Sequence, residues 1–251
     1  MPVYFVRYEL TNGFVHNWLV AGPQSIPVSD LDRYQGEDWK LQIARHYFDK
    51  DSGLVCMPVQ DETFQIGDVQ LPWTYFRCDD DHYVDATAFY HTCNYLRAWA
   101  YSQVISSVAY AATCVLTTNG PADVWLNGQH VHRQEHFHHQ LPCSVAFQAE
   151  LAAGPNEFLV RFEQVAAREC PYALALQVEG LPADAFVHVP TSYEGVARRQ
   201  TVENAIEAAH LERDVYVWDD EITVHWDKQL GTSADLTVRL QQPEGWIHSE
   251  A

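Results

Sequence analysis

From residue 1 to about residue 182, hydrophobic and polar positions alternate with the period of a β-strand. In the run Phe-Leu-Val-Arg-Phe, the side chains of Phe158, Val160 and Phe162 share one face. Turn residues such as Asn119-Gly120-Pro121 separate the runs. Many short strands with little helix predict an all-β fold, an antiparallel jelly roll or β-sandwich. The predicted strands lie at residues 3–10, 14–20, 95–101, 111–118, 122–126, 144–151, 158–163 and 172–178.

Two stretches depart from simple alternation. Residues 24–68 contain Pro, Gly and Asp, and are expected to form long loops with a short helix near Trp39–Tyr47. Asn127-Gly128 lies between two strand-like runs and predicts a tight β-hairpin. A type I′ turn needs positive φ at both central residues, and Asn followed by Gly adopts this conformation readily. Five histidines follow between His130 and His139. They are predicted to lie on the emerging strand and its rim.

The pattern changes after residue 182. Hydrophobic residues recur at helical spacing between Val202 and Ala209, which predicts a helix near residues 201–210 with Thr201 as its N-cap. Three further strands are predicted, too few to enclose a core of their own. We therefore expect a β-sandwich domain at residues 1–182. At residues 183–251 we expect a connecting helix and the start of a second β-sandwich domain, completed by a longer chain or a partner. These three strands are predicted at residues 214–218, 222–226 and 235–240.

Charge and cysteine content narrow the classes of function. The 251 residues include 34 acidic and 15 basic side chains, giving a formal charge of -19. A surface so negative repels phosphates and anionic lipids, so nucleic-acid and membrane partners are not expected, whereas neutral sugars are unaffected. The six cysteines form no Cys-x-x-Cys pair and the N-terminus lacks signal-peptide features, so we expect reduced thiols and a cytoplasmic localisation. Composition leaves the oligomeric state open.

The histidine cluster His130–His139 poses a choice between a metal centre and an exposed rim. His130 and His132 lie two apart on a strand, which is expected to project both from one face, as in cupin-type metal sites. Gly128 and Glu135 lie closer in sequence to these histidines than the corresponding glycine and glutamate do in cupins. No second cupin motif follows. We therefore predict no metal and interpret the cluster as a solvated or ligand-facing rim, with a metal-dependent cupin-like β-barrel enzyme as the alternative. The candidate ligand-binding residues are Trp125, His130, His132, Glu135 and His136.

No cofactor is predicted, with a structural calcium ion as the alternative. The loop Asp79-Asp80-Asp81 with Asp85 offers the hard oxygen ligands of calcium, but it lacks the glycine-centred loop of an EF-hand. No catalytic residue is assigned, since no nucleophile, phosphate-binding or zinc-peptidase motif is present. The strand aromatics are expected to be core residues, with a sugar-stacking platform as the alternative. These aromatics are Trp73, Tyr75, Trp99, Tyr101 and Trp125.

Four segments carry motifs that occur together in a known order. Residues 17–23 read Asn-Trp-Leu-Val-Ala-Gly-Pro, and residues 95–101 read Tyr-Leu-Arg-Ala-Trp-Ala-Tyr. Residues 118–128 end in Val-Trp-Leu-Asn-Gly, and residues 151–162 contain Leu-Ala-Ala-Gly-Pro-Asn. Together they resemble the N-terminal galactose-binding-like jelly-roll region of large multidomain bacterial glycoside hydrolases, of the beta-galactosidase-like or rhamnosidase-like kind.

The resemblance implies a non-catalytic role for this chain. In that family the jelly roll precedes a further β-domain and then a separate barrel that carries the catalytic acids. A barrel of about 250 residues has no room here. The expected function is the front section of a glycoside hydrolase-like protein, which contacts carbohydrate or supports a C-terminal catalytic domain absent from this chain. A free-standing carbohydrate-binding module is the alternative.

Overall fold

The computed structural model describes residues 2–49, 51–54, 56–79, 81–213, 215–217 and 221–226, with the backbone of residues 239–241 and 247–250. The chain divides into two compact units, residues 1–192 and residues 193–251. The domain boundary predicted after residue 182 stays a prediction. None of the described helices has the length and apolar character that crossing a bilayer requires.

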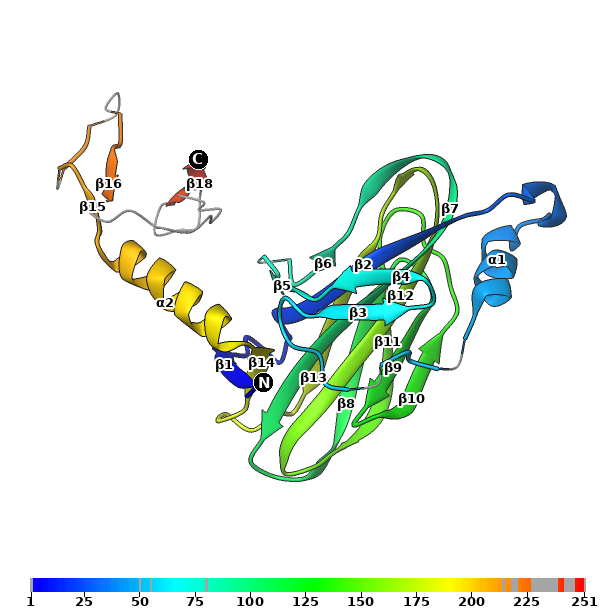
Figure 1. The fold of residues 1–251 in the computed structure, drawn as a ribbon, viewed down its shortest axis with the longest axis horizontal. Helices are drawn as coiled ribbons and strands as arrows, with labels where there is room; N and C mark the ends of the chain where they lie inside the picture. The colour runs from blue at the N-terminus through cyan, green and yellow to red at the C-terminus, as the bar shows by residue number, and fades with distance from the viewer. Residues whose placement is uncertain are drawn as a thin grey trace. The chain divides into compact units, whose positions relative to one another are not determined.

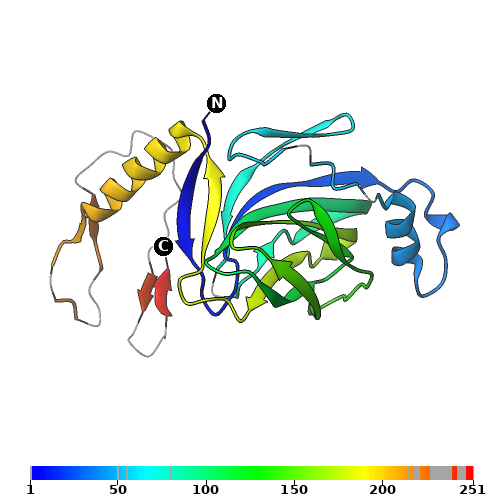
Figure 2. The same ribbon diagram turned by 90° about the horizontal axis from the view of Figure 1, so that it is seen from below.

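The first unit is a sandwich of two antiparallel sheets, so the prediction of an all-β fold is confirmed (Figures 1 and 2). The larger sheet has the strand order β1 (Tyr4–Glu9), β14 (Phe186–Thr191), β7 (Ala88–Ser106), β12 (Gly154–Cys170), β9 (Ala122–Leu126) and β10 (Gln129–Gln134). Two further strands belong to this sheet: β2 (Asn17–Pro27) pairs with β7, and β5 (Thr74–Arg77) pairs with β2. The smaller sheet consists of β11 (Cys143–Leu151), β8 (Tyr110–Thr118), β13 (Ala173–Glu179) and β6 (Val84–Asp85).

The main core lies between the two sheets. Phe158, Val160 and Phe162 of β12, which share a face because of the strand period, are at most 1 % exposed. They belong to the same buried cluster as Leu116 of β8 and Leu176 of β13. Burial of each such side chain contributes roughly 1.5–3 kcal/mol. The alternation read from the sequence therefore marks the surface on which the sheets pack.

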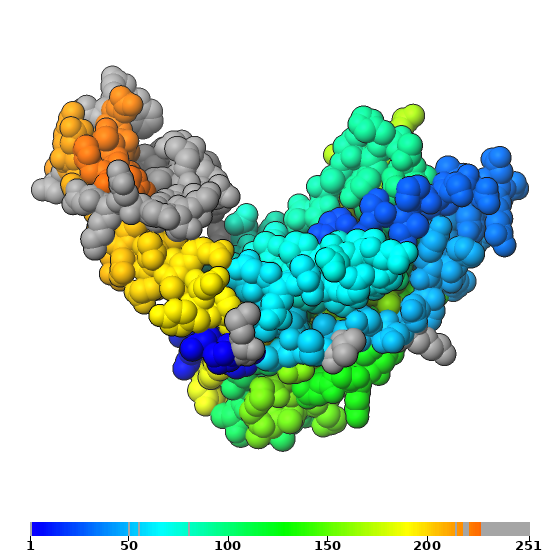
Figure 3. Space-filling view, in the orientation of Figure 1, coloured from blue at the N-terminus to red at the C-terminus, as the bar shows by residue number. Residues whose placement is uncertain are grey.

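The outer face of the larger sheet is covered by the segment that joins β2 to β5. Trp99 of β7 donates from Nε1 to the carbonyl oxygen of Ser52 (3.1 Å), and Phe64 packs edge-on against the Trp99 ring with 5.0 Å between centroids. The short predicted helix is confirmed, whereas residues 24–68, expected to form loops, also contain the end of β2 and all of β3. The segment contains η1 (Leu31–Arg33), α1 (Trp39–Tyr47), β3 (Thr63–Ile66) and β4 (Val69–Pro72), and its β3–β4 hairpin is cyan in Figure 3.

The Asn127-Gly128 turn joins β9 to β10, as predicted. Asn127 has φ 50° and Gly128 has φ 78°, so both central residues have the positive φ that a type I′ turn requires. Asn127 also accepts a hydrogen bond at Oδ1 from the backbone N–H of Glu157 (2.8 Å). The turn is thus tied to β12, the neighbouring strand on the other side of β9.

The second unit contains one α-helix and two short hairpins among its described residues. The helix α2 (Tyr193–Glu207) begins well before residue 201. Thr201 therefore lies inside it, where its hydroxyl donates to the carbonyl oxygen of Ala197 (2.9 Å), and the prediction of Thr201 as the N-cap is wrong. The hairpins pair β15 (Ala209–Leu211) with β16 (Val224–Trp226), and β17 (Arg239–Gln241) with β18 (Ile247–Glu250).

Only some of the strands predicted in this unit are found. The strand predicted over residues 222–226 is found only over its last three residues, as β16. Residues 215–217 do not form a strand, so the prediction over residues 214–218 is wrong in its described part, and β15 supplies the partner strand instead. Asp214, Trp218 and most of the strand predicted over residues 235–240 lie outside the described residues.

Candidate functional site

A β-bulge in β10 separates the predicted site histidines. The register with β9 shifts between His130, which pairs with Trp125, and His132, which pairs with Val124. Because neighbouring positions of β9 face opposite sides of the sheet, the two histidines project from opposite faces. The prediction that both project from one face is wrong. The paired-histidine geometry of a cupin is therefore not formed by these two residues.

On the outer face of the larger sheet, Asp123 is the centre of a buried ionic network. Its carboxylate, 1 % exposed, accepts hydrogen bonds from Arg133 (2.6 Å) and Arg161 (2.9 Å), and Nε2 of His130 lies 2.8 Å from Oδ1. The strand register places Arg133, Asp123 and Arg161 in one row across β10, β9 and β12. Because a buried charge is tolerated only when it is paired, this network ties the three strands together.

Glu163 is a second buried carboxylate beside the same guanidinium groups. Its Oε1 lies 3.5 Å from Nε of Arg161 and 3.6 Å from Nη1 of Arg133. Neither carboxylate oxygen has a hydrogen-bond partner among the described residues. Burial raises the pKa of Glu163 to about 7, against the opposing effect of Arg161 and Arg133. The charge of the network therefore changes near neutral pH.

Trp125 borders a cavity of about 350 Å³ on the outer face. Tyr101, Leu159 and Glu157 also line this cavity. The Trp125 side chain itself is buried, since the residue is only 5 % exposed and its ring lies 5.2 Å from the guanidinium carbon of Arg161. A ring this enclosed acts in packing and offers little surface on which a sugar could stack.

On the inner face, polar side chains follow the edge between the two sheets. His132 stacks on Phe147 of β11, with 4.4 Å between ring centroids, and Gln134 donates to Oγ1 of Thr118 (2.7 Å). Nε2 of His136 lies 3.4 Å from the carbonyl oxygen of Thr118. Burial lowers the pKa of both His132 and His136 from the ordinary value of 6.5, so both imidazoles are mainly neutral at pH 7.

A cavity of about 550 Å³ opens between α1 and the loop that follows β10. Two half-buried rings, Trp39 and Phe137, line it, and the ammonium group of Lys40 lies 5.7 Å and 5.9 Å from their centroids. Glu135 lies at its border and pairs with Arg45 (2.7 Å). The cavity thus combines aromatic surface with charged and hydrogen-bonding groups. Its polar lining includes Glu37, Asp38, Glu135, His136, Gln164 and Glu169.

The structure distributes the predicted site residues over several places. Glu135 and His136 line the 550 Å³ cavity, and Trp125 lines the 350 Å³ cavity. His130 contacts the ionic network, and His132 stacks between the sheets. Whether these residues bind a ligand stays a prediction.

Sequence reasoning did not select Trp39, Lys40 and Phe137. Residues 39 and 137 come from a helix and a loop almost a hundred positions apart, and no local pattern indicates that they meet. The one local signal was the short helix near Trp39–Tyr47, which places an aromatic residue at its first position.

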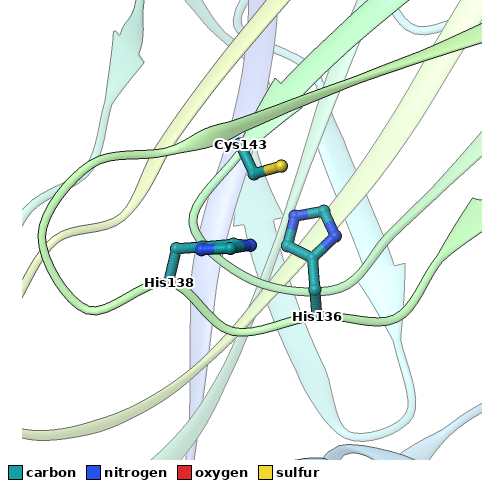
Figure 4. Close-up of side chains that lie close together, drawn as sticks. All are labelled: His136, His138 and Cys143. Atoms are coloured by element: carbon teal, nitrogen blue, oxygen red, sulfur yellow. The ribbon is translucent and has the colours of Figure 1, made fainter.

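One group of side chains among the described residues has the chemistry of a metal site. The donor atoms of His136, His138 and Cys143 lie within 4.8 Å of one another, and Figure 4 shows the three side chains facing a common point. His136 and His138 come from the loop after β10, and Cys143 is the first residue of β11.

The acidic loop considered for calcium is described in part. Asp80 lies outside the described residues. Asp81 accepts a hydrogen bond from the backbone N–H of Tyr83 (3.0 Å), and Asp85 accepts one from that of Thr87 (2.8 Å). These carboxylates stabilise local turns, and a structural calcium ion stays the alternative to the prediction of no cofactor.

Comparisons with known proteins give structural neighbours of low similarity. No protein-family model and no curated protein sequence matches the chain. A family 35 carbohydrate binding module from Clostridium thermocellum is 14 % identical and has a TM-score of 0.28, covering 39 % of this chain and 87 % of that chain. A family 35 module from an environmental isolate is 10 % identical and has a TM-score of 0.27, covering 72 % of this chain and 95 % of that chain.

The beta-glucosidase from Kluyveromyces marxianus, in complex with glucose, is 13 % identical, with a TM-score of 0.30. The match covers 57 % of this chain but only 16 % of the enzyme. At these identities and TM-scores, the neighbours do not indicate what this chain binds.

Proposed function

We propose that the sandwich binds a neutral carbohydrate in the 550 Å³ cavity between α1 and the loop after β10. The observation that carries this proposal is the presence of two half-buried rings, Trp39 and Phe137, beside hydrogen-bonding side chains in one cavity. The apolar face of a pyranose packs on an aromatic ring while its hydroxyl groups bond to polar neighbours. The volume lies in the range of small-ligand sites and suits a mono- or disaccharide.

The charges around the cavity favour a neutral sugar over an acidic one. The carboxylates of Glu37, Asp38 and Glu169 outnumber the ammonium group of Lys40, and Glu135 is paired with Arg45. A uronic acid would bring its own carboxylate close to these groups, and like charges repel across short distances. We therefore expect neutral saccharides to bind more tightly than uronic-acid saccharides of the same size.

We also propose that this binding serves a glycoside hydrolase-like protein whose catalytic acids lie in another module. The resemblance of the motifs at residues 17–23, 95–101, 118–128 and 151–162 supports this role. A free-standing carbohydrate-binding module is the alternative. The reading frame beyond Ala251 separates the two, because only the first requires several hundred further residues that form a catalytic barrel.

Glycan-array screening followed by calorimetric titration tests the cavity. We expect Trp39→Ala and Phe137→Ala each to weaken binding roughly two- to tenfold, since a stacking ring contributes about 0.5–1.5 kcal/mol and 1.4 kcal/mol is tenfold. Phe5→Ala is the matched control, because Phe5 is a 42 % exposed ring on β1, at the opposite edge of the larger sheet from β10. Absence of binding to any glycan, or unchanged affinity in both cavity variants, would contradict the proposal.

A further inference from the structure

We infer that His136, His138 and Cys143 form a zinc-binding site at the edge of the sandwich, a property separate from carbohydrate binding. Two imidazoles and a thiolate are ligands that Zn²⁺ prefers, at bond lengths of about 2.0–2.3 Å in a tetrahedron. Donors in such a tetrahedron lie about 3.3–3.8 Å apart. The donor atoms here lie within 4.8 Å of one another (Figure 4), so small side-chain rotations close the site.

One short stretch of backbone, Thr118 and Asn119, holds two of the ligands and lies beside the third. Cys143 is paired with Thr118 in the ladder between β11 and β8. The backbone N–H of His138 donates to the carbonyl oxygen of Asn119 (2.7 Å), and Nε2 of His136 lies 3.4 Å from that of Thr118. Both Thr118 and Asn119 are 1 % exposed. Because the scaffold is a buried strand end, little order has to be gained when a metal binds.

The donor atoms have no strong competing partners. The contacts of His136 Nε2 with Gln134 and Thr118 are both 3.4 Å, longer than ordinary hydrogen bonds. Sγ of Cys143 lies 3.8 Å from the carbonyl oxygen of Ser144. Within the described part of the chain, the imidazole of His138 has no hydrogen-bond partner and contacts the His136 ring edge-on, at 4.8 Å between centroids. A metal ion would therefore displace no strong interaction.

The site leaves one coordination position open toward the 550 Å³ cavity. His136 and His138 both line that cavity, and three protein ligands leave a tetrahedral ion with a fourth position for water or another ligand. Binding replaces the thiol proton of Cys143, which is released to solvent. A thiolate with two imidazoles selects zinc over calcium or magnesium, which require oxygen ligands. This trio does not include His130 and His132, the pair weighed as metal ligands in the cupin-like alternative, and it differs from the prediction of no metal.

Titration of the full chain with zinc chloride against a chromophoric chelator tests the site. We expect one equivalent of zinc to bind, with affinity reduced at least about tenfold by His138→Ala and by Cys143→Ser. His139→Ala and Cys56→Ser are matched controls, because these residues are an exposed histidine of the same cavity and an exposed thiol outside the trio. Both controls are expected to leave zinc affinity unchanged.

Cobalt substitution gives a second, spectroscopic measurement. A thiolate ligand produces a sulfur-to-cobalt charge-transfer band, which Cys143→Ser should abolish and Cys56→Ser should retain. Zinc binding of equal stoichiometry and affinity in the wild type and both ligand variants would overturn the site. So would binding of less than about a tenth of an equivalent by the wild type. Neither result overturns the carbohydrate proposal, which rests on Trp39 and Phe137, since these two residues supply no metal ligand.

Discussion

At the scale of single residues, Asp123 and Glu163 occupy different electrostatic environments although both are buried beside Arg133 and Arg161. Asp123 accepts direct hydrogen bonds from both guanidinium groups, at 2.6 Å and 2.9 Å. Glu163 approaches them only to 3.5 Å and 3.6 Å, and neither of its oxygens has a hydrogen-bond partner among the described residues. Burial therefore raises the pKa of Glu163 to about 7.

This shift predicts a pH dependence of stability that Glu163→Gln removes. The pKa of Glu163 is about 7 in the folded protein and close to the ordinary value of 4.5 in the unfolded chain, so between these values only the folded state keeps the proton. The contribution of Glu163 to the free energy of unfolding is therefore full below pH 4.5 and declines as the pH rises toward 7. Between pH 5 and pH 8 the free energy of unfolding of the wild type should therefore fall by about 2 kcal/mol more than that of Glu163→Gln.

Urea unfolding of both proteins at pH 5 and pH 8 measures this difference. Glu150→Gln, which removes an exposed carboxylate from β11, is the matched control. A stability difference between wild type and Glu163→Gln that is the same at both pH values would show that burial does not set the charge of Glu163.

At the scale of elements, features that depend on neighbouring residues could be predicted from the sequence. Features that depend on contacts between distant strands could not. Asn127-Gly128 identified the hairpin, because positive φ at two successive residues is a local demand. The bulge after it brings His130 and Arg133, which are three positions apart, to Asp123 on the same outer face. Strand alternation cannot reveal such a shift. Likewise β9 is buried along its whole length, because both of its faces are covered.

Replacement of glycine by alanine is expected to cost different amounts of stability at Gly128, in the turn between β9 and β10, and at Gly120, in the turn between β8 and β9. Gly128→Ala should cost about 1 kcal/mol, because an alanine is strained at φ 78° although no atom lies within 4 Å of the new Cβ. Gly120→Ala should cost more, about 1–3 kcal/mol, because its Cβ would lie 2.1 Å from the carbonyl oxygen of Glu163 and must push β12 away from the turn. The free energies of unfolding in urea measure both. An equal or smaller loss for Gly120→Ala would contradict the close approach of this turn to β12.

At the scale of the whole molecule, the fold class was predictable but the candidate site was not. Alternation along the strands depends on the chain itself, and it indicated the sandwich correctly. The 550 Å³ cavity joins α1, the loop after β10 and the end of β12, so its lining depends on how distant segments meet. Glu135 and His136 were selected because they follow a recognisable hairpin. Trp39 and Phe137 were missed because no local pattern links them.

The division of the chain leads to a prediction about truncation. β14 pairs with β1 and β7 in the larger sheet, and its Val187 and Val189 are at most 1 % exposed. A chain that ends at Ser192 keeps this strand, whereas a chain that ends at Pro182 loses it. We expect residues 1–192 to unfold cooperatively and to retain carbohydrate affinity, since every residue lining the 550 Å³ cavity lies within them.

Residues 1–182 should be less stable than residues 1–192 by at least about 3–6 kcal/mol, because burial of each valine contributes roughly 1.5–3 kcal/mol before the lost strand pairing is counted. Loss of β14 also leaves β1 without its partner in the sheet and exposes the edge of β7, which favours association between chains. Urea unfolding together with size-exclusion chromatography measures both effects. If residues 1–182 matched residues 1–192 in stability and remained monomeric, β14 would belong functionally to the second unit, and the boundary predicted after residue 182 would describe the domains better.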